Sequence, residues 1–521
     1  MAGPLAVEGE FETIDQLMFA AARQIGDREA YVEVATGQRL TFAEWVDAAS
    51  RVAAHLRDVG VGRGDVVAIA MAPSIDFAIG CAGALLAGAV ATGINTRLGP
   101  REIAGIFARC APKLVIRDES FVVPDSTGGI SPPKVIERSE LVGLAESHAP
   151  LGDRDGTSSA DDPAVIIWTS GTTGIPKGAW FDHRNLAAAV QTAGEMSRAF
   201  DRRLSGIPMA HAGYMAKIWE QFALGLTLVL TPTPWSAAVM LDVLVDERIT
   251  VGAGVPTQWA KLLELPATEH ADLSALRLCL AATAPAAPEL IERMTTVLGA
   301  PVVVRYAMTE SPSISGTTPD DPPEVQFRTV GRPQNGVQIR LVDESGGVDD
   351  LGGTVPQGAV GRVQVTGPCV MRGYWRDPDQ TAAAIDADGW LSSGDLGHLD
   401  DDGNLILVGR AGDMYIRGGY NVYPLEVENV VAENPGVATV AVIGVPAPVI
   451  GEIGVAYVVA ERGGPQDHLL SLGEMRSWVR KYLADYKAPD ELVIVEALPL
   501  TPMGKVDKVA LRVDWDRRGT N

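Results

Sequence analysis

Apolar runs alternate with helical patterns through the first part of the chain, and this order constrains the fold more than any other feature of the sequence. Thr41 and Glu44 form a capping box before a helical apolar pattern, and Val66–Ala72 is typical of a buried strand. Ser74 caps a second helix, and the apolar run Val90–Ile94 follows it. Strands that alternate with helices predict a parallel sheet covered by helices. The strand pattern returns in four later segments: Ala164–Trp168, Val251–Val255, Leu276–Ala281 and Val302–Arg305.

The pattern changes twice further along the chain, which indicates more than one domain. A length of 521 residues already exceeds what one core usually organises. After about Gln326, short alternating segments such as Gln338–Val342 and Gly361–Val365 lie between Gly- and Pro-rich turns, as antiparallel strands do. From Asp413 onward a new α/β pattern begins. The segment Gly409–Gly412 is therefore the best candidate for a domain boundary.

The charge balance excludes some classes of partner. With 43 Lys and Arg against 66 Asp and Glu, the formal net charge is −23. Such a surface repels phosphate backbones and anionic membranes, so we expect no nucleic-acid partner. A polyphosphate ligand would need positive groups supplied locally by its site.

Neither a membrane span nor a disulfide scaffold is expected. The stretch Phe77–Thr96 carries no charge and is long enough to cross a bilayer, but it is rich in Gly and Ala. We interpret it as a buried helix followed by a buried strand, and we expect no stable membrane insertion. The four cysteines are far apart in sequence and form no C-x-x-C pair, so no zinc or redox motif is indicated. The first fifteen residues lack the features of a signal peptide, and a cytoplasmic location fits best.

The strongest local motif is the loop TSGTTGIPKG, which follows an apolar strand. Glycines let backbone amides converge on an anion, hydroxyls add donors, and a lysine adds charge, so the loop is suited to a phosphate chain. It is not a Walker A loop, because the second glycine comes too soon and glycine follows the lysine. The alternative is a surface turn rich in Gly, Ser and Thr. The phosphate-binding candidates are Thr169, Ser170, Gly171, Thr172, Thr173, Gly174 and Lys177.

This loop resembles the signature of the adenylate-forming enzymes, which include acyl-CoA synthetases, peptide-synthetase adenylation domains and firefly-type luciferases. Four further segments match the family's motifs in order. Tyr306–Glu310 resembles Y-G-x-T-E, and Gly389–Asp395 resembles G-W-x-x-T-G-D. Gly409–Glu426 resembles the hinge-and-tunnel motif, and Leu498–Lys508 resembles the C-terminal lysine motif. The resemblance covers essentially the whole chain and is greatest to bacterial acyl-CoA synthetases.

The resemblance implies an α/β fold in two domains. Residues 1–411 would form a large N-terminal domain that binds ATP and the acid, with parallel-rich sheets, helices and a β-barrel-like region. Residue 412 would be the hinge, and residues 413–521 a small, mobile C-terminal α+β lid. The family usually has Asp or Lys at the hinge, whereas this chain has Gly412.

The resemblance also assigns roles in a reaction that joins a carboxylate to the α-phosphate of ATP. Both reactants are anions, so cations and amides must neutralise them. Glu310 would hold Mg²⁺, Thr309 would meet the α-phosphate, and Lys505 would bridge the carboxylate and the phosphate. Other family positions belong to the nucleotide site: Tyr306 stacking on adenine, Thr283, Ala284 and Pro285 beside the purine, Asp395 and Arg410 on the ribose, and Arg305, Ala307 and Met308 around them. Taken singly, most of these charged residues would be interpreted as solvated surface charges.

Further positions of the resemblance concern the acid and coenzyme A. His211 would close the acyl site and gate coenzyme A, although a buried structural histidine is the alternative. Gly418 and Gly419 would leave a channel for the pantetheine arm. Ala307 replaces a glycine of the family, so its methyl group should narrow the acyl slot, and so should Ala282 and Thr283 where the family has Gly-Gly. Weaker candidates for the pocket are Tyr214, Thr257, Gln258, Trp259, Ala281 and Ser313, of which Trp259 could equally be core.

The function favoured at this point is an ATP-dependent carboxylate–CoA ligase for an apolar acid of medium size. Its partner is a small-molecule carboxylic acid, and a carrier protein or a homodimer remains open. The alternatives are an enzyme that loads a carrier protein, a ligase efficient in only one half-reaction, a luciferase-type oxidase and a non-catalytic binding protein.

Overall fold

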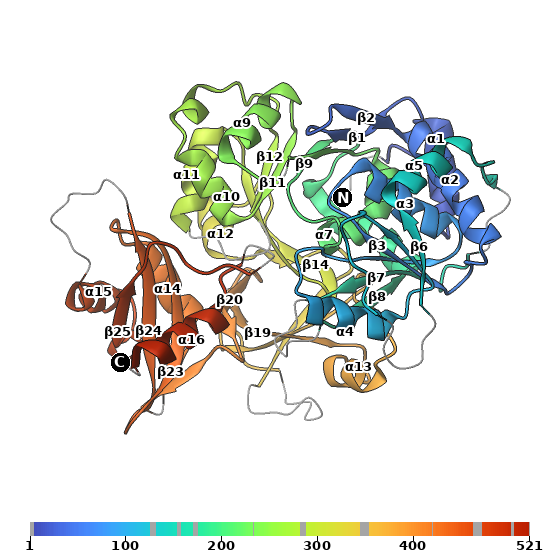
Figure 1. Ribbon diagram of the computed structural model, residues 1–521. Coiled ribbons are helices and arrows are strands. Elements are labelled where there is room, and N and C mark those ends of the chain that lie inside the picture. The colour runs from blue at the N-terminus through green and yellow to red at the C-terminus, as the bar shows by residue number, and fades with distance from the viewer. Residues whose placement is uncertain are drawn as a thin grey trace.

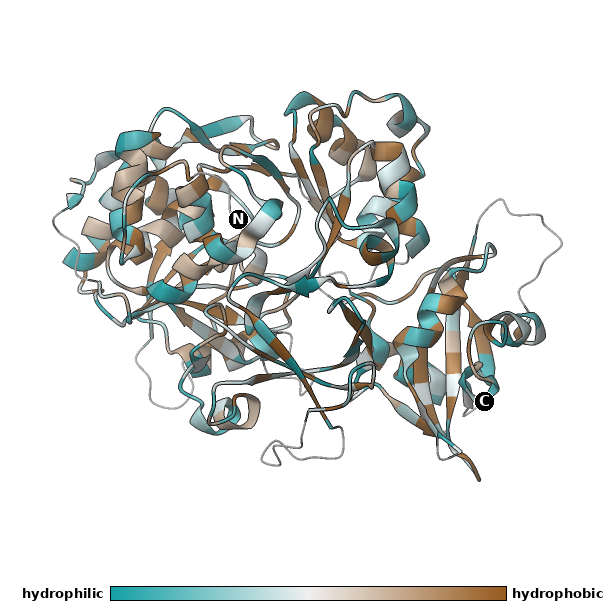
Figure 2. Cartoon of the chain, turned by 180° about the vertical axis from the view of Figure 1, so that it is seen from behind, coloured by the Kyte–Doolittle hydropathy of each residue, from teal (hydrophilic) through white to brown (hydrophobic). Residues whose placement is uncertain are grey.

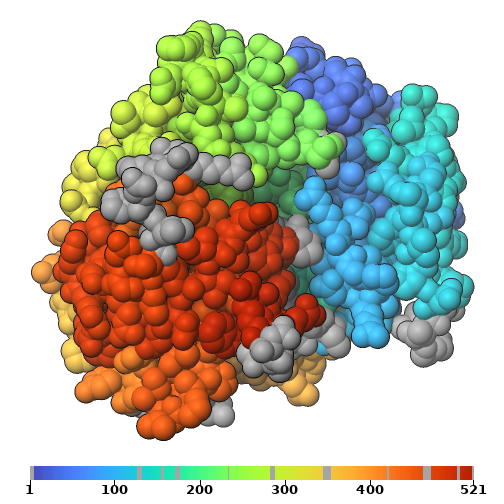
Figure 3. All heavy atoms as spheres, turned by 60° about the vertical axis from the view of Figure 1, so that its left-hand side comes forward, coloured from blue at the N-terminus to red at the C-terminus, as the bar shows by residue number. Residues whose placement is uncertain are grey.

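The structure is a computed structural model, and it describes residues 5–125, 132–153, 158–169, 176–232, 234–281, 288–343, 354–418, 420–461, 471–501 and 505–519. In this part of the chain, three sheets build a large N-terminal body. A fourth sheet with its helices forms a smaller C-terminal body, drawn in red and orange-brown to one side in Figure 1. Figure 3 shows this body seated against the large one, with a recess between it and the blue part of the chain.

The first large sheet has the parallel core that the alternation predicts. Its strands in sheet order are β18 (Gly373–Tyr374), β8 (Gly178–Asp182), β7 (Pro163–Trp168), β4 (Val90–Gly93), β3 (Val66–Ala70), β5 (Leu114–Arg117) and β6 (Lys134–Glu137). Strands β7, β4, β3, β5 and β6 are parallel, and β8 and β18 join antiparallel. The helices around it are α2 (Phe42–Asp58), α3 (Ile75–Leu86), α4 (Pro100–Cys110) and α5 (Arg138–Ser147).

Local signals in this region were interpreted correctly. The capping box of Thr41 and Glu44 starts α2, and the Ser74 side chain caps α3. The uncharged stretch after Phe77 forms α3 and β4, and both are buried. Among the described residues, no helix combines the length and apolar character needed to cross a bilayer. All four cysteines are free and buried.

The second large sheet is also parallel at its centre. Its strands in order are β15 (Arg332–Pro333), β14 (Ser311–Gly316), β13 (Val302–Met308), β12 (Leu278–Ala281), β11 (Val251–Gly254), β9 (Arg202–Ser205), β10 (Thr227–Leu230), β1 (Glu29–Glu33) and β2 (Gln38–Thr41). Its helices are α1 (Ile14–Gln24), α6 (His183–Ala193), α7 (Ala212–Met215), α8 (Ile218–Leu224), α9 (Ala237–Asp246), α10 (Pro256–Leu263), α11 (Pro288–Leu298) and α12 (Pro323–Arg328). Trp45 of α2 stacks on Phe222 of α8 with ring centroids 4.3 Å apart, so one apolar core joins elements of both sheets.

The region expected to be barrel-like is a four-stranded antiparallel sheet in the described residues. Its strands are β16 (Gln338–Val342), β17 (Gly361–Thr366), β19 (Leu391–Leu399) and β20 (Leu405–Arg410), and α13 (Pro378–Ala384) lies between β18 and β19 in the chain. The strands lie in the sheet in the same order as in the chain, and β16 and β20 form the edges of the sheet. The last strand, β20, leads directly into the small domain.

The small domain is α+β. Its strands are β21 (Tyr415–Arg417), β22 (Tyr420–Val422), β23 (Val437–Ala447), β24 (Gly451–Ala460) and β25 (Glu491–Ile494), and its helices are α14 (Pro424–Ala432), α15 (Leu472–Val479) and α16 (Lys508–Gly519). In Figure 2 its strands are largely brown, the apolar colour, and its helices show more teal. Tyr415 is buried, and a Cβ atom at either Gly444 or Gly454 would overlap its side chain. The two glycines thus let the tyrosine lock β21 onto β23 and β24.

Candidate active site

The motif loop is held at its base by a hairpin. Strands β7 and β8 pair antiparallel up to Trp168 and Gly178. The Thr169 amide donates to the Lys177 carbonyl oxygen over 2.9 Å, and the Lys177 amide donates to Thr169 Oγ1 over 3.3 Å. This base fixes where Lys177 leaves the sheet. The residues Ser170, Gly171, Thr172, Thr173 and Gly174 lie outside the described part of the chain.

Lys177 and Glu310 both contact Tyr374. The Lys177 Nζ atom lies 4.5 Å from the centroid of the Tyr374 ring and donates to Gln380 Oε1 over 3.3 Å. The Tyr374 hydroxyl donates to Glu310 Oε1 over 2.7 Å. Glu310 is 8 % exposed, and its carbonyl oxygen accepts from the Met371 amide over 2.8 Å. Two predicted residues of opposite charge are thus brought together by a tyrosine that sequence reasoning missed.

A second cluster joins Tyr306, Asp395 and Arg410. Asp395 and Arg410 face each other on β19 and β20, and Arg410 Nε donates to Asp395 Oδ1 over 2.9 Å. The Tyr306 hydroxyl donates to Asp395 Oδ2 over 2.5 Å. The Asp395 charge raises the pKa of Arg410, while burial and the same carboxylate raise the pKa of Tyr306. Each carboxylate oxygen keeps a lone pair, so Asp395 can still accept from two ribose hydroxyls.

Lys505 acts electrostatically on residues of the large domain. Desolvation by the surrounding protein and the positive charge of Arg410 lower the pKa of Lys505, while Asp395 and Glu310 oppose that shift. Burial and the charge of Lys505 lower the pKa of His211 to about 4, so His211 is neutral at pH 7. These charge effects indicate that the lysine of the small domain lies near His211 and the residues of both clusters.

His211 begins a short helix beside this cleft. It is the N-cap residue of α7, and its Nδ1 atom accepts from the Gly213 amide over 3.1 Å. The bond fixes the ring and leaves Nε2 as the atom that carries the proton in the neutral imidazole. A neutral ring suits the wall of an acyl site better than a charged one.

Arg305 does not join the nucleotide residues. Successive residues of a strand point to opposite faces, and Arg305 precedes Tyr306 on β13. Its Nη2 atom donates to the Ala193 carbonyl oxygen over 2.7 Å at the end of α6, and its side chain lies across Gly316. Burial lowers its pKa to about 10. In this structure Arg305 thus closes the C-terminal end of α6, and its role beside the nucleotide stays a prediction.

The remaining candidates divide into three groups. Ala307 is exposed, and Met308 and Thr309 are half-buried, at the end of β13. Gly418 has φ +58°, a left-handed conformation that favours glycine. The residues Thr283, Ala284, Pro285 and Gly419 lie outside the described residues, as does Ala282.

Several weaker candidates for the acyl pocket have structural partners. Trp259 is fully buried, and its Nε1 atom donates to the Leu280 carbonyl oxygen over 3.1 Å, so the core interpretation holds. The buried Tyr214 hydroxyl lies 2.9 Å from that of Tyr31. Ser313 Oγ donates to the Thr192 carbonyl oxygen over 3.2 Å, and Gln258 Oε1 accepts from the Val255 amide over 3.1 Å. Thr257 is exposed and Ala281 is buried at the end of β12.

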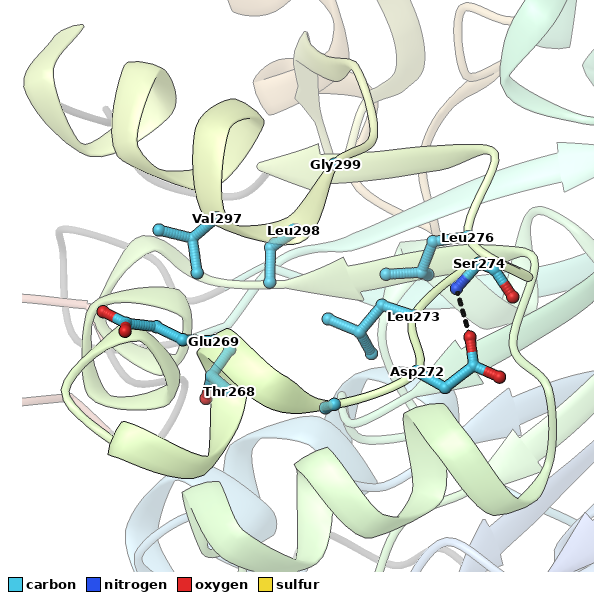
Figure 4. A pocket seen from close by; sticks show the side chains of 10 residues that line it. Thr268, Glu269, Asp272, Leu273, Ser274, Leu276, Val297, Leu298 and Gly299 are labelled. Carbon is cyan, nitrogen blue, oxygen red and sulfur yellow. Dashed lines mark hydrogen bonds between the residues drawn. The ribbon is translucent and has the colours of Figure 1, made fainter.

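A surface pocket elsewhere on the large domain is separate from this chemistry. Figure 4 shows it between the α11 end, at Val297 and Leu298, and the loop with Asp272 and Leu273. Asp272 Oδ1 accepts from the Ser274 amide within it over 3.1 Å. None of the predicted site residues lines this pocket.

Comparisons with known proteins agree with the two-part architecture. Residues 18–375 match the family model described as AMP-binding enzyme, and residues 426–505 match the one described as AMP-binding enzyme C-terminal domain. A (7a-methyl-1,5-dioxo-octahydroindenyl)propanoyl:CoA ligase from Rhodococcus jostii is 35% identical over 94% of this chain and 96% of its own. A feruloyl-CoA synthase from Amycolatopsis is 33% identical over 91% of this chain and 94% of its own. The structure of ATP-bound MatB from Rhodopseudomonas palustris superposes with a TM-score of 0.83 at 29% identity, over 96% of this chain and 99% of that one.

Proposed function

The chain belongs to the AMP-binding enzyme family, and from this we propose that it is an ATP-dependent carboxylate–CoA ligase for an apolar acid of medium size. The observation that carries the proposal is the pair of charged clusters in the large domain: Lys177 and Glu310 both contact Tyr374, and Tyr306 and Arg410 both bind Asp395. The charges of Glu310, Asp395 and Arg410 also act on Lys505 of the small domain. Two of the similar proteins named above, the propanoyl:CoA ligase and the feruloyl-CoA synthase, carry names of enzymes that form CoA thioesters, which supports the same reaction.

In the first half-reaction, a carboxylate oxygen of the acid attacks the α-phosphorus of ATP, and the bond to the bridging oxygen breaks to release pyrophosphate. Lys177 and the motif loop would hold the phosphates, while Asp395 and Arg410 would hold the ribose. Lys505 would lie between the two reacting anions and offset the charge that builds up there. The acyl-adenylate would remain in the cleft.

The residues present fit Mg²⁺ that arrives with ATP. In the described part of the chain, no group of three or more His, Cys, Asp or Glu side chains could hold a metal alone. Mg²⁺ is commonly bound by one or two carboxylates together with substrate phosphates, and Glu310 offers one such buried carboxylate beside Lys177. When bound, the ion would neutralise phosphate charge.

In the second half-reaction, the thiol of coenzyme A attacks the acyl carbonyl carbon, and AMP leaves. We propose that residues 413–521 rotate about residue 412 relative to residues 1–411 for this step. In support, β20 ends at Arg410 and β21 begins at Tyr415, so only a short segment separates the two bodies. Gly418 and Gly419 would then admit the pantetheine arm, with His211 at the acyl side. The four free cysteines support a location in a reducing compartment such as the cytoplasm.

The function is tested with a panel of carboxylic acids. Pyrophosphate release with an apolar acid of medium size, followed by thioester formation when coenzyme A is added, is the expected result. Pyrophosphate release without a CoA thioester would favour transfer to a carrier protein instead. No acid-dependent release across linear, alicyclic and aromatic acids would contradict the proposal.

Exchanging Ala307 for Gly should admit acids with more bulk near the carboxylate. The side chain is exposed at the end of β13, next to Met308 and Thr309. One methyl group accounts for roughly 1 kcal/mol of steric discrimination, so the ratio of kcat/KM for α-branched to linear acids should rise about tenfold at most. An unchanged ratio in pyrophosphate-release assays would show that Ala307 does not line the acyl slot.

Exchanging Gly412 for Pro should impair thioester formation far more than adenylation. In the orientation seen here Lys505 is at the cleft, and Gly412 has no left-handed φ. Proline fixes φ near −65° and so restricts the rotation that the second half-reaction needs. Acid-dependent pyrophosphate exchange and thioester formation from supplied acyl-AMP measure the two steps separately.

The matched control is Gly412→Ala. A Cβ atom at this position meets nothing within 4 Å, so alanine should leave adenylation near the wild-type rate. Equal losses of both half-reactions in the proline variant would contradict the hinge role. Comparable rates of both steps in the wild type would exclude a ligase efficient in only one half-reaction.

A further inference from the structure

Tyr374 lies between the two groups that the proposed function assigns to the phosphates and the metal. Its ring faces Lys177 Nζ at 4.5 Å, and its hydroxyl donates to Glu310 Oε1 over 2.7 Å. The side chain is 6 % exposed, so both contacts are shielded from solvent. A tyrosine hydroxyl ordinarily has a pKa of about 10, so it is a donor at neutral pH.

The position of Tyr374 is fixed independently of both contacts. It belongs to β18, which pairs with β8 so that Tyr374 faces Ala179. Its amide donates to Thr381 Oγ1 over 2.9 Å, and the Met371 amide of the same segment donates to the Glu310 carbonyl oxygen. The tyrosine therefore stands on an anchored strand, and Glu310 is held to that strand through both its backbone and its side chain.

We propose that Tyr374 is a positioning residue for the first half-reaction, which orients the Glu310 carboxylate for the metal and keeps it apart from Lys177. The inference rests on the proposed function of the site. The hydroxyl occupies one carboxylate oxygen and leaves Oε2 to bind a hard cation. Second partners of this kind fix the direction of a metal-binding carboxylate.

The ring has a separate role in the same arrangement. An ammonium and a carboxylate that share a site attract each other. A direct ion pair would neutralise the two charges that the phosphates and the metal need. In the described structure Lys177 and Glu310 form no ion pair with each other, and each of them contacts the tyrosine. The aromatic face stabilises the ammonium through its quadrupole, while the N–H groups that do not donate to Gln380 remain for phosphate oxygens.

Two variants distinguish the role of the hydroxyl from the role of the ring. Tyr374→Phe keeps the ring and loses the hydroxyl, so we expect the Mg²⁺ concentration for half-maximal pyrophosphate exchange to rise about 10-fold or more, as for other partners of metal-binding groups. The KM for ATP at saturating Mg²⁺ should change little. Tyr374→Leu also loses the ring, so the KM for ATP should rise as well. Thioester formation from supplied acyl-AMP should keep its wild-type rate in both variants.

A binding measurement gives a readout that does not depend on turnover. Calorimetric titration with α,β-methylene-ATP, with and without Mg²⁺, measures how much the metal strengthens binding. In Tyr374→Phe this gain should fall about 10-fold or more relative to wild type, while binding without Mg²⁺ stays the same. The matched control is Tyr457→Phe, which removes a buried hydroxyl that donates to Asp514 Oδ2 over 3.0 Å in the small domain, and it should match the wild type.

Three outcomes would overturn the inference. Unchanged Mg²⁺ dependence in Tyr374→Phe would show that the hydroxyl does not orient Glu310. Equal losses in both half-reactions would show a structural role only. A Mg²⁺ response altered as much in Tyr457→Phe would show that the effect is not local. Absence of acid-dependent exchange in the wild type would instead overturn the proposed function, so the two failures are distinguishable.

Discussion

Replacing Lys505 by Ala should lower acid-dependent pyrophosphate exchange by roughly 10²–10³-fold or more, as expected when a transition-state charge partner is lost. The acid and the α-phosphate are both anionic, and Lys505 brings a positive charge to the cleft from the small domain. Its interactions with Glu310 and Asp395 support this placement. Alanine removes the charge without adding bulk, so substrate binding should change less than the rate.

The same variant should largely keep thioester formation from supplied acyl-AMP, because in the proposed function the small domain rotates away for that step. Lys481→Ala is the matched control: Lys481 lies over Trp478 on the same domain, away from the cleft, and its loss should leave both steps unchanged. Loss of both half-reactions in Lys505→Ala, with a normal unfolding transition, would count against the assigned role.

Replacing Glu310 by Gln should abolish Mg²⁺-dependent adenylation in a folded protein. The amide keeps the size of the side chain and can still accept from the Tyr374 hydroxyl, which lies 2.7 Å from Glu310 Oε1. It lacks the charge that a hard cation requires, so the loss should follow from metal binding and not from packing. Pyrophosphate exchange measured across a range of Mg²⁺ concentrations tests this.

The control for this variant is Glu324→Gln. Glu324 is exposed and pairs with Arg328 on α12, so its amide variant should retain wild-type exchange. Wild-type activity of Glu310→Gln at ordinary Mg²⁺ would contradict the metal role. A loss accompanied by a lower melting temperature would instead indicate that the buried carboxylate supports the fold.

Much of the fold could be predicted because its strands are apolar and its helices carry caps. Strand β9 could not, since Arg202–Ser205 contains two arginines and no apolar run. Ion pairs stabilise this strand: Arg202 pairs with Glu29 over 2.7 Å and also with Glu247. These pairs connect β9 to β1, on the far side of β10, and to the end of α9. Single-sequence patterns do not reveal such long-range partners.

The candidate site was predictable where motifs carry it and not where tertiary pairing does. Lys177, Glu310 and Asp395 stand in recognisable motifs, and the structure brings them to one region. Tyr374 was not predicted, because β18 has only two residues and the contacts of Tyr374 depend on the pairing of β18 with β8. The contact of Arg305 with the end of α6 could not be predicted, because adjacent residues of a strand point to opposite faces and the partner lies far away in sequence.

Because the Tyr415 side chain packs closely against Gly444 and Gly454, the small domain is rigid from its first strand onward. Since β20 ends at Arg410 and Tyr415 is already locked into the next sheet, rotation is confined to the few bonds between them. Lys505 belongs to the small domain, beyond this segment in the chain, so a turn there would move its ammonium together with the domain. In the proposed function, a small set of backbone torsions between the two sheets would therefore withdraw the lysine, and neither sheet would have to bend.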